Sequence, residues 1–291
     1  MAVLFNIVPV ALAAAAVNDQ ARAVNQQTDP RIVAARALIQ RTAPSYADAF
    51  SLELLPASST VESLDTPSAM QMDSDGSSIV LRGTGAVELA AAFNWYLNDY
   101  LNVTVDWNTY GAQQLPDSLP LPLPAASPVV ARRVEWSYYM NVCTYGYSLA
   151  FVPWSYWEQH IDWMAMQGIN MPLAFVGQEW VWERVFESFN VSVAEQRSFY
   201  SGAAFLPWFR MGNLRGFGGP LSDGWMQSRR DLGVQIVSRM RELGMKPALG
   251  AFAGHVPGAF AAHFPSAKIT RSPDWAGFDA ANPDTAAFAD V

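Results

Sequence analysis

The spacing of apolar residues along the first third of the chain changes from a helical period to a strand period and back. One helix is predicted to begin at Asp29 and Pro30 and to end before Pro44, with an apolar face of Ile32, Val33, Leu38 and Ile39. Short strands are predicted over residues 50–55, 69–72 and 78–82, with a turn over 73–77 that contains Gly76. A second helix, capped by Thr84, carries apolar residues at helical spacing: Leu89, Phe93, Tyr96, Leu97 and Tyr100. These elements predict a small α+β domain over residues 29–110.

Residues 111–130 are rich in proline, which is typical of a semi-rigid linker, and the pattern then changes to alternating strands and helices. Strands are predicted over residues 133–142, 169–176 and 246–253. A helix with Ser155 and Glu158 at capping-box spacing is predicted to end at Gly168, and another over residues 222–243 to end at Gly244. Alternating βα units of this kind build an α/β fold, either an open doubly wound sheet or a barrel.

A stretch of 45 residues, 177–221, separates the second predicted strand from the next long helix. It includes a short helix predicted to be capped by Ser192, with Glu195 three residues later. TIM barrels carry their functional loops at the carboxyl ends of the strands, where this stretch begins. A dinucleotide-binding fold would need a glycine fingerprint after the first strand, and residues 142–145 have none. Residues 131–291 are therefore predicted to form the first part, about three of eight βα units, of a TIM (β/α)8 barrel.

Composition and charge narrow the classes of function. The formal net charge of −8 argues against a nucleic-acid-binding protein, and 51% hydrophobic residues are enough for a large core. A single Cys and three His argue against a disulfide scaffold and a His/Cys metal site, so no metal or cofactor is expected.

Residues 1–17 have the apolar run and alanine-rich end of a secretory signal peptide, and the run is too short to span a membrane. Two Asn-x-Ser/Thr sequons, at Asn102 and Asn190, fit the same route, although such triplets also arise by chance. The expected location is the secretory pathway, with a lysosomal or extracellular destination.

Polar residues follow the predicted strand ends and are the candidates for ligand contact: Asn141, Cys143, Tyr147, Gln178, Glu179 and His255. Together with Trp154, Trp208 and Trp225 they suit a sugar, because aromatic faces pack on its C–H surface and polar groups bind its hydroxyls. Each has a structural alternative. Glu179 also favours a helix N-terminus, and His255 also suits a loop residue whose hydrogen bonds are satisfied. Cys143 also suits a small buried filler, and the tryptophans also suit the core.

Several longer motifs resemble the α-N-acetylglucosaminidases of glycoside hydrolase family 89, over about residues 130–270. They are YYMNVCT at 138–144, IDWMA at 161–165, GIN at 168–170, GQE at 177–179, FLPW at 205–208, RMGNL at 210–214 and FAGHVP at 252–257. The resemblance implies a small N-terminal domain, a (β/α)8 catalytic barrel and a C-terminal helical domain. It also implies retaining hydrolysis of terminal α-linked N-acetylglucosamine from glycans such as heparan sulfate. Asn141, Cys143 and Trp208 match the family's sugar pocket, and Asn213 lies in a matched motif.

Retaining hydrolysis needs two carboxyl groups about 5–5.5 Å apart on either side of the scissile bond. The family's first glutamate lies in an Asn-Glu-Met-Gln type motif that is absent here, so both catalytic glutamates are expected downstream and none in this chain. Glu183 and Glu187 follow Glu179 at helical spacing, which describes one helix face and not a clamped sugar.

Two interpretations remain open. The chain is the N-terminal portion of a glycosidase, or it is a truncated homologue that binds sugar weakly or is inactive. A metal-dependent barrel hydrolase is disfavoured because the chain has no paired His motif.

Overall fold

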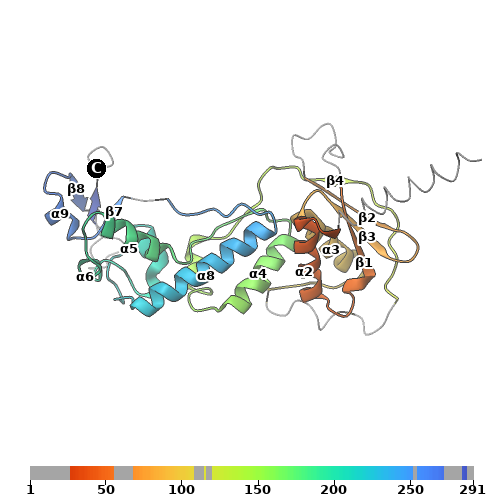
Figure 1. The fold of residues 1–291 in the computed structure, drawn as a ribbon, viewed down its shortest axis with the longest axis horizontal. Helices are drawn as coiled ribbons and strands as arrows, with labels where there is room; N and C mark the ends of the chain where they lie inside the picture. The colour runs from red at the N-terminus through yellow and green to blue at the C-terminus, as the bar shows by residue number, and fades with distance from the viewer. Residues whose placement is uncertain are drawn as a thin grey trace, which may run out of the picture. The chain divides into compact units, whose positions relative to one another are not determined.

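The computed structural model of the protein describes residues 27–55, 68–107, 115, 120–251, 254–271 and 284–286 (Figure 1). The chain divides into two compact units. The first is Met1–Ser137 with Gln159–Asn170 and Met240–Lys246, and the second is Tyr138–Glu158 with Met171–Arg239 and Pro247–Val291. The first unit therefore holds the predicted N-terminal domain and linker together with three stretches of the predicted barrel, residues 131–137, 159–170 and 240–246. The predicted signal peptide, residues 1–17, lies outside the described residues.

The first unit is built on a four-stranded mixed sheet in the order β1-β3-β2-β4 (Figure 1). Its strands are β1 (Phe50–Leu54), β2 (Ala69–Ser74), β3 (Ile79–Gly83) and β4 (Val130–Ala131). β1 runs parallel to β3, and β2 runs antiparallel to β3 and to β4. The predicted turn is confirmed: the Asp75 carboxylate accepts the backbone N–H groups of Ser77 and Ser78, and Gly76 has φ +88°.

Helices α2 (Pro30–Thr42) and α3 (Ala86–Leu101) pack against each other and against this sheet (Figure 1). A short 3₁₀ helix, η1 (Ala47–Ala49), leads into β1. Asp29 caps α2 through the N–H of Arg31, as its sequence predicts. Two expectations are wrong. Val33 is 52% exposed, and Gly85, not Thr84, is the N-cap of α3, because the Thr84 hydroxyl accepts the N–H of Ala69 instead.

Residues 120–130, the described end of the predicted linker, pack on the rest of the first unit. The Tyr96 hydroxyl donates to the carbonyl of Pro122 (2.8 Å), and Leu121 is buried. Ser127 exchanges hydrogen bonds with the backbone of Met72, just before β4 joins the sheet. The segment from residue 120 is therefore held against the first unit by hydrogen bonds before it enters β4.

The second unit contains three parallel backbone segments that pair in chain order. β5 (Tyr138–Tyr139) is parallel to β6 (Met171–Pro172), and Leu173 forms a parallel bridge with Ala248. The predicted strands are longer than those observed. The strand predicted over 133–142 begins only at Tyr138. In the residues before it, the Asn170 side chain accepts the N–H of Ser137 and donates to the carbonyl of Glu135, so these backbone groups are not available to extend β5. The strand predicted over 246–253 was also expected to be buried, and this is wrong, since Leu249 is 66% exposed.

Helices α4 (Trp154–Met166) and α8 (Asp223–Glu242) contribute residues to both units. Both helices end just before the glycine at which the sequence predicted their end. Gly168 has φ +72° and Gly244 has φ +78°, and in each case the next residue donates to a carbonyl in the last turn. Ser155 lies inside α4 and does not cap it, and Glu158 binds Arg239 (2.7 Å), so the predicted capping box is wrong.

Residues 177–221 hold α5 (Gln178–Ser188), α6 (Val193–Gln196), η5 (Ala203–Phe205) and α7 (Leu206–Arg210). The predicted Ser192–Glu195 capping box of α6 is confirmed. A small antiparallel sheet follows, in the order β7-β9-β8: β7 (His255–Val256), β8 (Ile269–Arg271) and β9 (Asp284–Ala286), with α9 (Phe260–His263) between β7 and β8. An aromatic core supports these elements, with Phe199 and Phe209 edge to face at 4.8 Å.

Large apolar side chains are exposed on both outer parallel segments of the second unit. Tyr138 is 56% exposed and Leu249 is 66% exposed. Because open strand edges with apolar side chains favour association, the 291-residue chain on its own is expected to form oligomers or aggregates. Size-exclusion chromatography with light scattering tests this, and Leu249→Lys is expected to reduce association. A monodisperse wild-type monomer with a cooperative thermal transition contradicts it.

Candidate functional site

The first predicted site segment is the 3₁₀ helix η4 (Val142–Gly146), which directly follows β5. The Asn141 side chain caps it by accepting the N–H of Cys143 (2.7 Å). Cys143 is half-buried, and Tyr147 is 66% exposed. Between them Tyr145 is buried and its hydroxyl donates to the carbonyl of Leu173 (2.5 Å). Burial raises the pKa of Tyr145 far above its ordinary value, so this hydroxyl keeps its proton.

The second predicted segment is the first turn of α5, with Gln178 and Glu179. Glu179 is 2% exposed and binds Arg210 through two hydrogen bonds, from Nε to Oε1 (2.7 Å) and from Nη2 to Oε2 (3.0 Å). Both carboxylate oxygens of Glu179 are therefore occupied by one guanidinium. The side chains of Gln178 and Phe175 both lie against the backbone of Gly250.

Trp208 lies in α7, and its ring is edge to face with Tyr147 at a centroid distance of 6.4 Å. This contact depends on a close approach of α7 to η4. A Cβ on Gly146 would lie 2.5 Å from Pro207 Cδ, so only glycine allows the two segments to pack in this way. Two aromatic residues predicted to contact sugar are thus neighbours in the fold.

His255, from the third predicted segment, lies in β7. Its ring contacts the backbone of Gly212, which precedes Asn213. Gly212 has φ +76°, and a Cβ there would overlap the imidazole ring. Burial lowers the pKa of His255, which favours the neutral ring. The motifs at 210–214 and 252–257 therefore meet, although they are far apart in the sequence.

The cavity beside these segments is small. Its volume is about 20 Å³, and its lining includes Tyr145, Glu179, Arg210 and Trp225. A cavity of this size holds about one water molecule, so it does not accommodate a sugar ring. Trp225 is half-buried, with Phe151 at its edge (5.7 Å) and Arg229 over its face (4.8 Å). Trp154 is half-buried at the start of α4.

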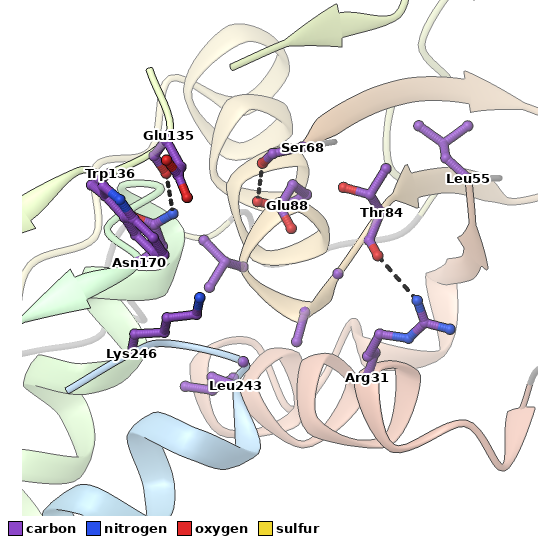
Figure 2. Close-up of a pocket in the computed structure, with 14 residues that line it drawn as sticks. Arg31, Leu55, Ser68, Thr84, Glu88, Glu135, Trp136, Asn170, Leu243 and Lys246 are labelled. Carbon is purple, nitrogen blue, oxygen red and sulfur yellow. Dashed lines mark hydrogen bonds between the residues drawn. The ribbon is translucent and has the colours of Figure 1, made fainter. Parts of the chain in front are cut away.

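A roomier hollow, of about 490 Å³, lies in the first unit (Figure 2). Figure 2 shows Lys246 pointing into it, and the Lys246 ammonium lies 4.5 Å from the centre of the Trp136 ring. Trp136, Asn170 and Lys246 lie just before the three parallel segments, whereas the predicted sugar contacts follow them. In TIM barrels the amino ends of the strands contribute stability and the carboxyl ends carry the active site. Its position therefore argues against this hollow as the sugar site.

Both sequon asparagines are exposed and close a helix. Asn102 ends α3 with φ +53°, and Asn190 follows α5 with φ +63°. Asparagine tolerates this left-handed conformation better than most residues, which is a sufficient structural reason for its presence. Glycosylation at these positions stays a prediction.

In the residues that the structure describes, no group of three or more His, Cys, Asp and Glu side chains is arranged to hold a metal ion. None of the helices described has both the length and the apolar character needed to cross a bilayer.

Arg210 lies in the RMGNL motif at 210–214, but no role was predicted for it. Its guanidinium lies 5.9 Å from the centre of the Tyr145 ring and 5.6 Å from that of Phe175. No local pattern marks such a residue, because its partners are separated from it along the chain. Glu179, for example, is 31 positions away.

Two family models match this chain. The model for the alpha-N-acetylglucosaminidase (NAGLU) tim-barrel domain matches residues 137–290, and the model for the NAGLU N-terminal domain matches residues 33–122. Human alpha-N-acetylglucosaminidase is 38% identical over 252 residues, which are 85% of this chain and 33% of the human protein.

Solved structures of a family 89 glycoside hydrolase from Clostridium perfringens are also similar. The complex with 2-acetamido-1,2-dideoxynojirmycin has a TM-score of 0.76 and 28% identity, over 94% of this chain and 30% of that one. A variant in complex with its substrate GlcNAc-alpha-1,4-galactose gives the same values over 99% of this chain and 32% of that one. The chain thus spans about a third of the length of these relatives. Because the barrel-domain model covers more than half of it, the chain belongs to the alpha-N-acetylglucosaminidase family.

Proposed function

We propose that the protein containing this chain is a retaining glycoside hydrolase that removes terminal α-linked N-acetylglucosamine from glycans such as heparan sulfate. The match of the barrel-domain model to residues 137–290 carries this proposal. A relative of similar fold binds GlcNAc-alpha-1,4-galactose as its substrate, which supports the same sugar and linkage. We further propose that the protein enters the secretory pathway and reaches the lysosome or the exterior.

In this proposal the chain supplies the N-terminal domain and the first part of the (β/α)8 barrel. The parallel order of β5, β6 and the Ala248 segment supports that arrangement. The exposed Tyr147 and half-buried Trp208 form an aromatic surface for the C–H face of the sugar ring, and Asn141 and Asn213 offer amide groups to its hydroxyls. Gln178, Cys143 and His255 complete the proposed contacts.

The two catalytic glutamates are proposed to lie beyond residue 291. Glu179 is a poor nucleophile here, because Arg210 occupies both of its oxygens. Burial raises the pKa of Glu183, but Arg184 lies 3.9 Å from it and Glu187 follows on the same helix, which is not the paired geometry of a retaining site. None of these carboxylates therefore supplies the pair of flanking carboxyl groups that a retaining site needs.

Activity of the full-length protein tests the proposal. It is expected to hydrolyse an aryl α-N-acetylglucosaminide and not the β anomer, and NMR of the first product is expected to show the α anomer of the free sugar. An inactive full-length protein favours the alternative of an inactive or sugar-binding homologue. Release of the β anomer first contradicts a retaining mechanism.

Trp208→Ala is expected to raise KM for this substrate about tenfold, because an aromatic contact of about 1–1.5 kcal/mol is lost in both the bound and transition states. Asn141→Ala is expected to lower kcat/KM as well, through the loss of an amide contact and of the η4 cap. Trp95→Ala, at a 43% exposed tryptophan of α3 in the first unit, is the control and is expected to leave both constants unchanged. Unchanged kcat/KM in both site variants removes these residues from the sugar site.

A further inference from the structure

Three segments that carry proposed sugar contacts meet at the side chain of Arg210. Its guanidinium forms two hydrogen bonds with Glu179 in the first turn of α5, and lies 5.9 Å from the centre of the Tyr145 ring in η4. Arg210 itself is the last residue of α7, two positions after Trp208. The guanidinium also lies 5.6 Å from the centre of the Phe175 ring, which belongs to the segment that follows β6.

Both members of this ion pair are largely buried, with side-chain exposures of 7% for Arg210 and 3% for Glu179. A buried charge without its partner is costly, so each member strongly favours the position in which the pair is formed. The planar guanidinium of Arg210 is also held in one orientation, because two parallel hydrogen bonds to one carboxylate allow little rotation. The pair therefore restrains the end of a helix of five residues, which has little stability of its own.

We propose that Arg210 and Glu179 form a positioning pair for the sugar site. Arg210 holds Trp208 and η4 in place relative to each other, and Glu179 acts through Arg210 and is not a sugar ligand. This inference rests on the proposed function for the identity of the ligand, and it assigns Glu179 a role different from the contact expected from sequence.

Arg210→Lys in the full-length protein tests the proposal, because lysine keeps the charge but loses the two-point contact and the planar packing between rings. KM for the aryl α-N-acetylglucosaminide is expected to rise about tenfold with kcat within about threefold, since uniform binding is lost and the reacting groups are untouched. Glu179→Gln is expected to change KM in the same direction. The matched control is Arg239→Lys in the Arg239–Glu158 pair (2.7 Å), which lies on α8 and α4 and is expected to leave KM unchanged.

The reactivity of Cys143 gives a second measurement that needs no enzymatic activity. This thiol is half-buried in η4, two residues before Tyr145. Loosening of η4 in Arg210→Lys is expected to speed its alkylation by iodoacetamide about fivefold or more, as followed by mass spectrometry of the peptide that contains it. If Arg210→Lys does not fold, Glu179→Gln decides by the same two measurements.

The two proposals fail in different ways. An inactive wild-type protein refutes the proposed function, and Cys143 alkylation then still decides the positioning role. An active wild-type protein whose Arg210→Lys and Glu179→Gln variants keep the wild-type KM and alkylation rate refutes the positioning role alone. A rise in both measurements that Arg239→Lys reproduces also refutes it, because the effect is then a general loss of stability.

Discussion

Replacement of Arg41 by methionine is expected to lower the free energy of unfolding by about 3–5 kcal/mol, because it removes a two-point ion pair from the buried carboxylate of Asp162. Asp162, in α4, has no exposed side-chain surface, and Arg41, in the last turn of α2, is 22% exposed. Arg41 Nε lies 2.7 Å from Oδ2 and Nη2 lies 2.9 Å from Oδ1, which is a two-point contact. Urea denaturation of the full-length protein measures the loss.

Arg31→Met is the matched control at the other end of α2. The Arg31 side chain is 50% exposed in its pair with Asp29, and the loss there is expected to stay below about 1 kcal/mol. The double variant Arg41→Met/Asp162→Leu is expected to recover most of the stability, since both charges are then removed. Equal losses in Arg41→Met and Arg31→Met contradict the assignment of a buried pair.

Acidification from pH 6.5 to pH 4 is expected to destabilise the first unit by up to about 3 kcal/mol through His160 alone. His160 is 3% exposed, and burial lowers its pKa from 6.5 to about 4. Its ring stacks on Trp107 (5.2 Å, 28°) and lies 5.8 Å from Trp163. Because the unfolded chain binds the proton more readily, this contribution is complete above pH 6.5 and is lost as the pH falls toward 4. Attraction between a protonated ring and Trp107 offsets only part of the effect.

The contribution of His160 is measured by comparing the free energy of unfolding of the wild type with that of a variant in which residue 160 does not titrate. His160→Phe and His160→Gln are each expected to flatten the dependence of unfolding free energy on pH between 4 and 6.5, whatever their stability at neutral pH. Denaturation at several pH values measures the slope, which reaches about 1.4 kcal/mol per pH unit for one proton. A slope in both variants equal to that of wild type contradicts the role of His160.

Local chemistry determined the parts of the fold that the sequence predicted well. The Asp29 cap, the ends of α4 and α8 at Gly168 and Gly244, and the Ser192–Glu195 capping box follow from interactions within a few residues. The strands of the first unit were predicted to within one or two residues, but those of the second unit were predicted too long, because pairing depends on partners elsewhere in the chain. The Asn170 side chain, for example, occupies backbone groups of residues 135 and 137.

The site shows the same division. Sequence motifs identified the segments around Asn141, Glu179, Trp208 and His255, and the structure brings Tyr147 next to Trp208 and His255 next to Gly212. The motifs did not indicate that Glu179 is paired with Arg210, because a glutamate at a helix start looks the same whether its carboxylate is free or bound. Its environment, and not its position in the sequence, sets its role.

The family, the carboxyl ends of α4 and α8 and the residue types available for a sugar could all be predicted from the sequence, because these depend on composition, local capping and contiguous motifs. Which charges are buried together depends on how distant parts of the chain pack. Arg41 and Asp162 are 121 positions apart and Arg210 and Glu179 are 31 apart, and the strength of each pair comes from removal of water by residues that neither local sequence contains.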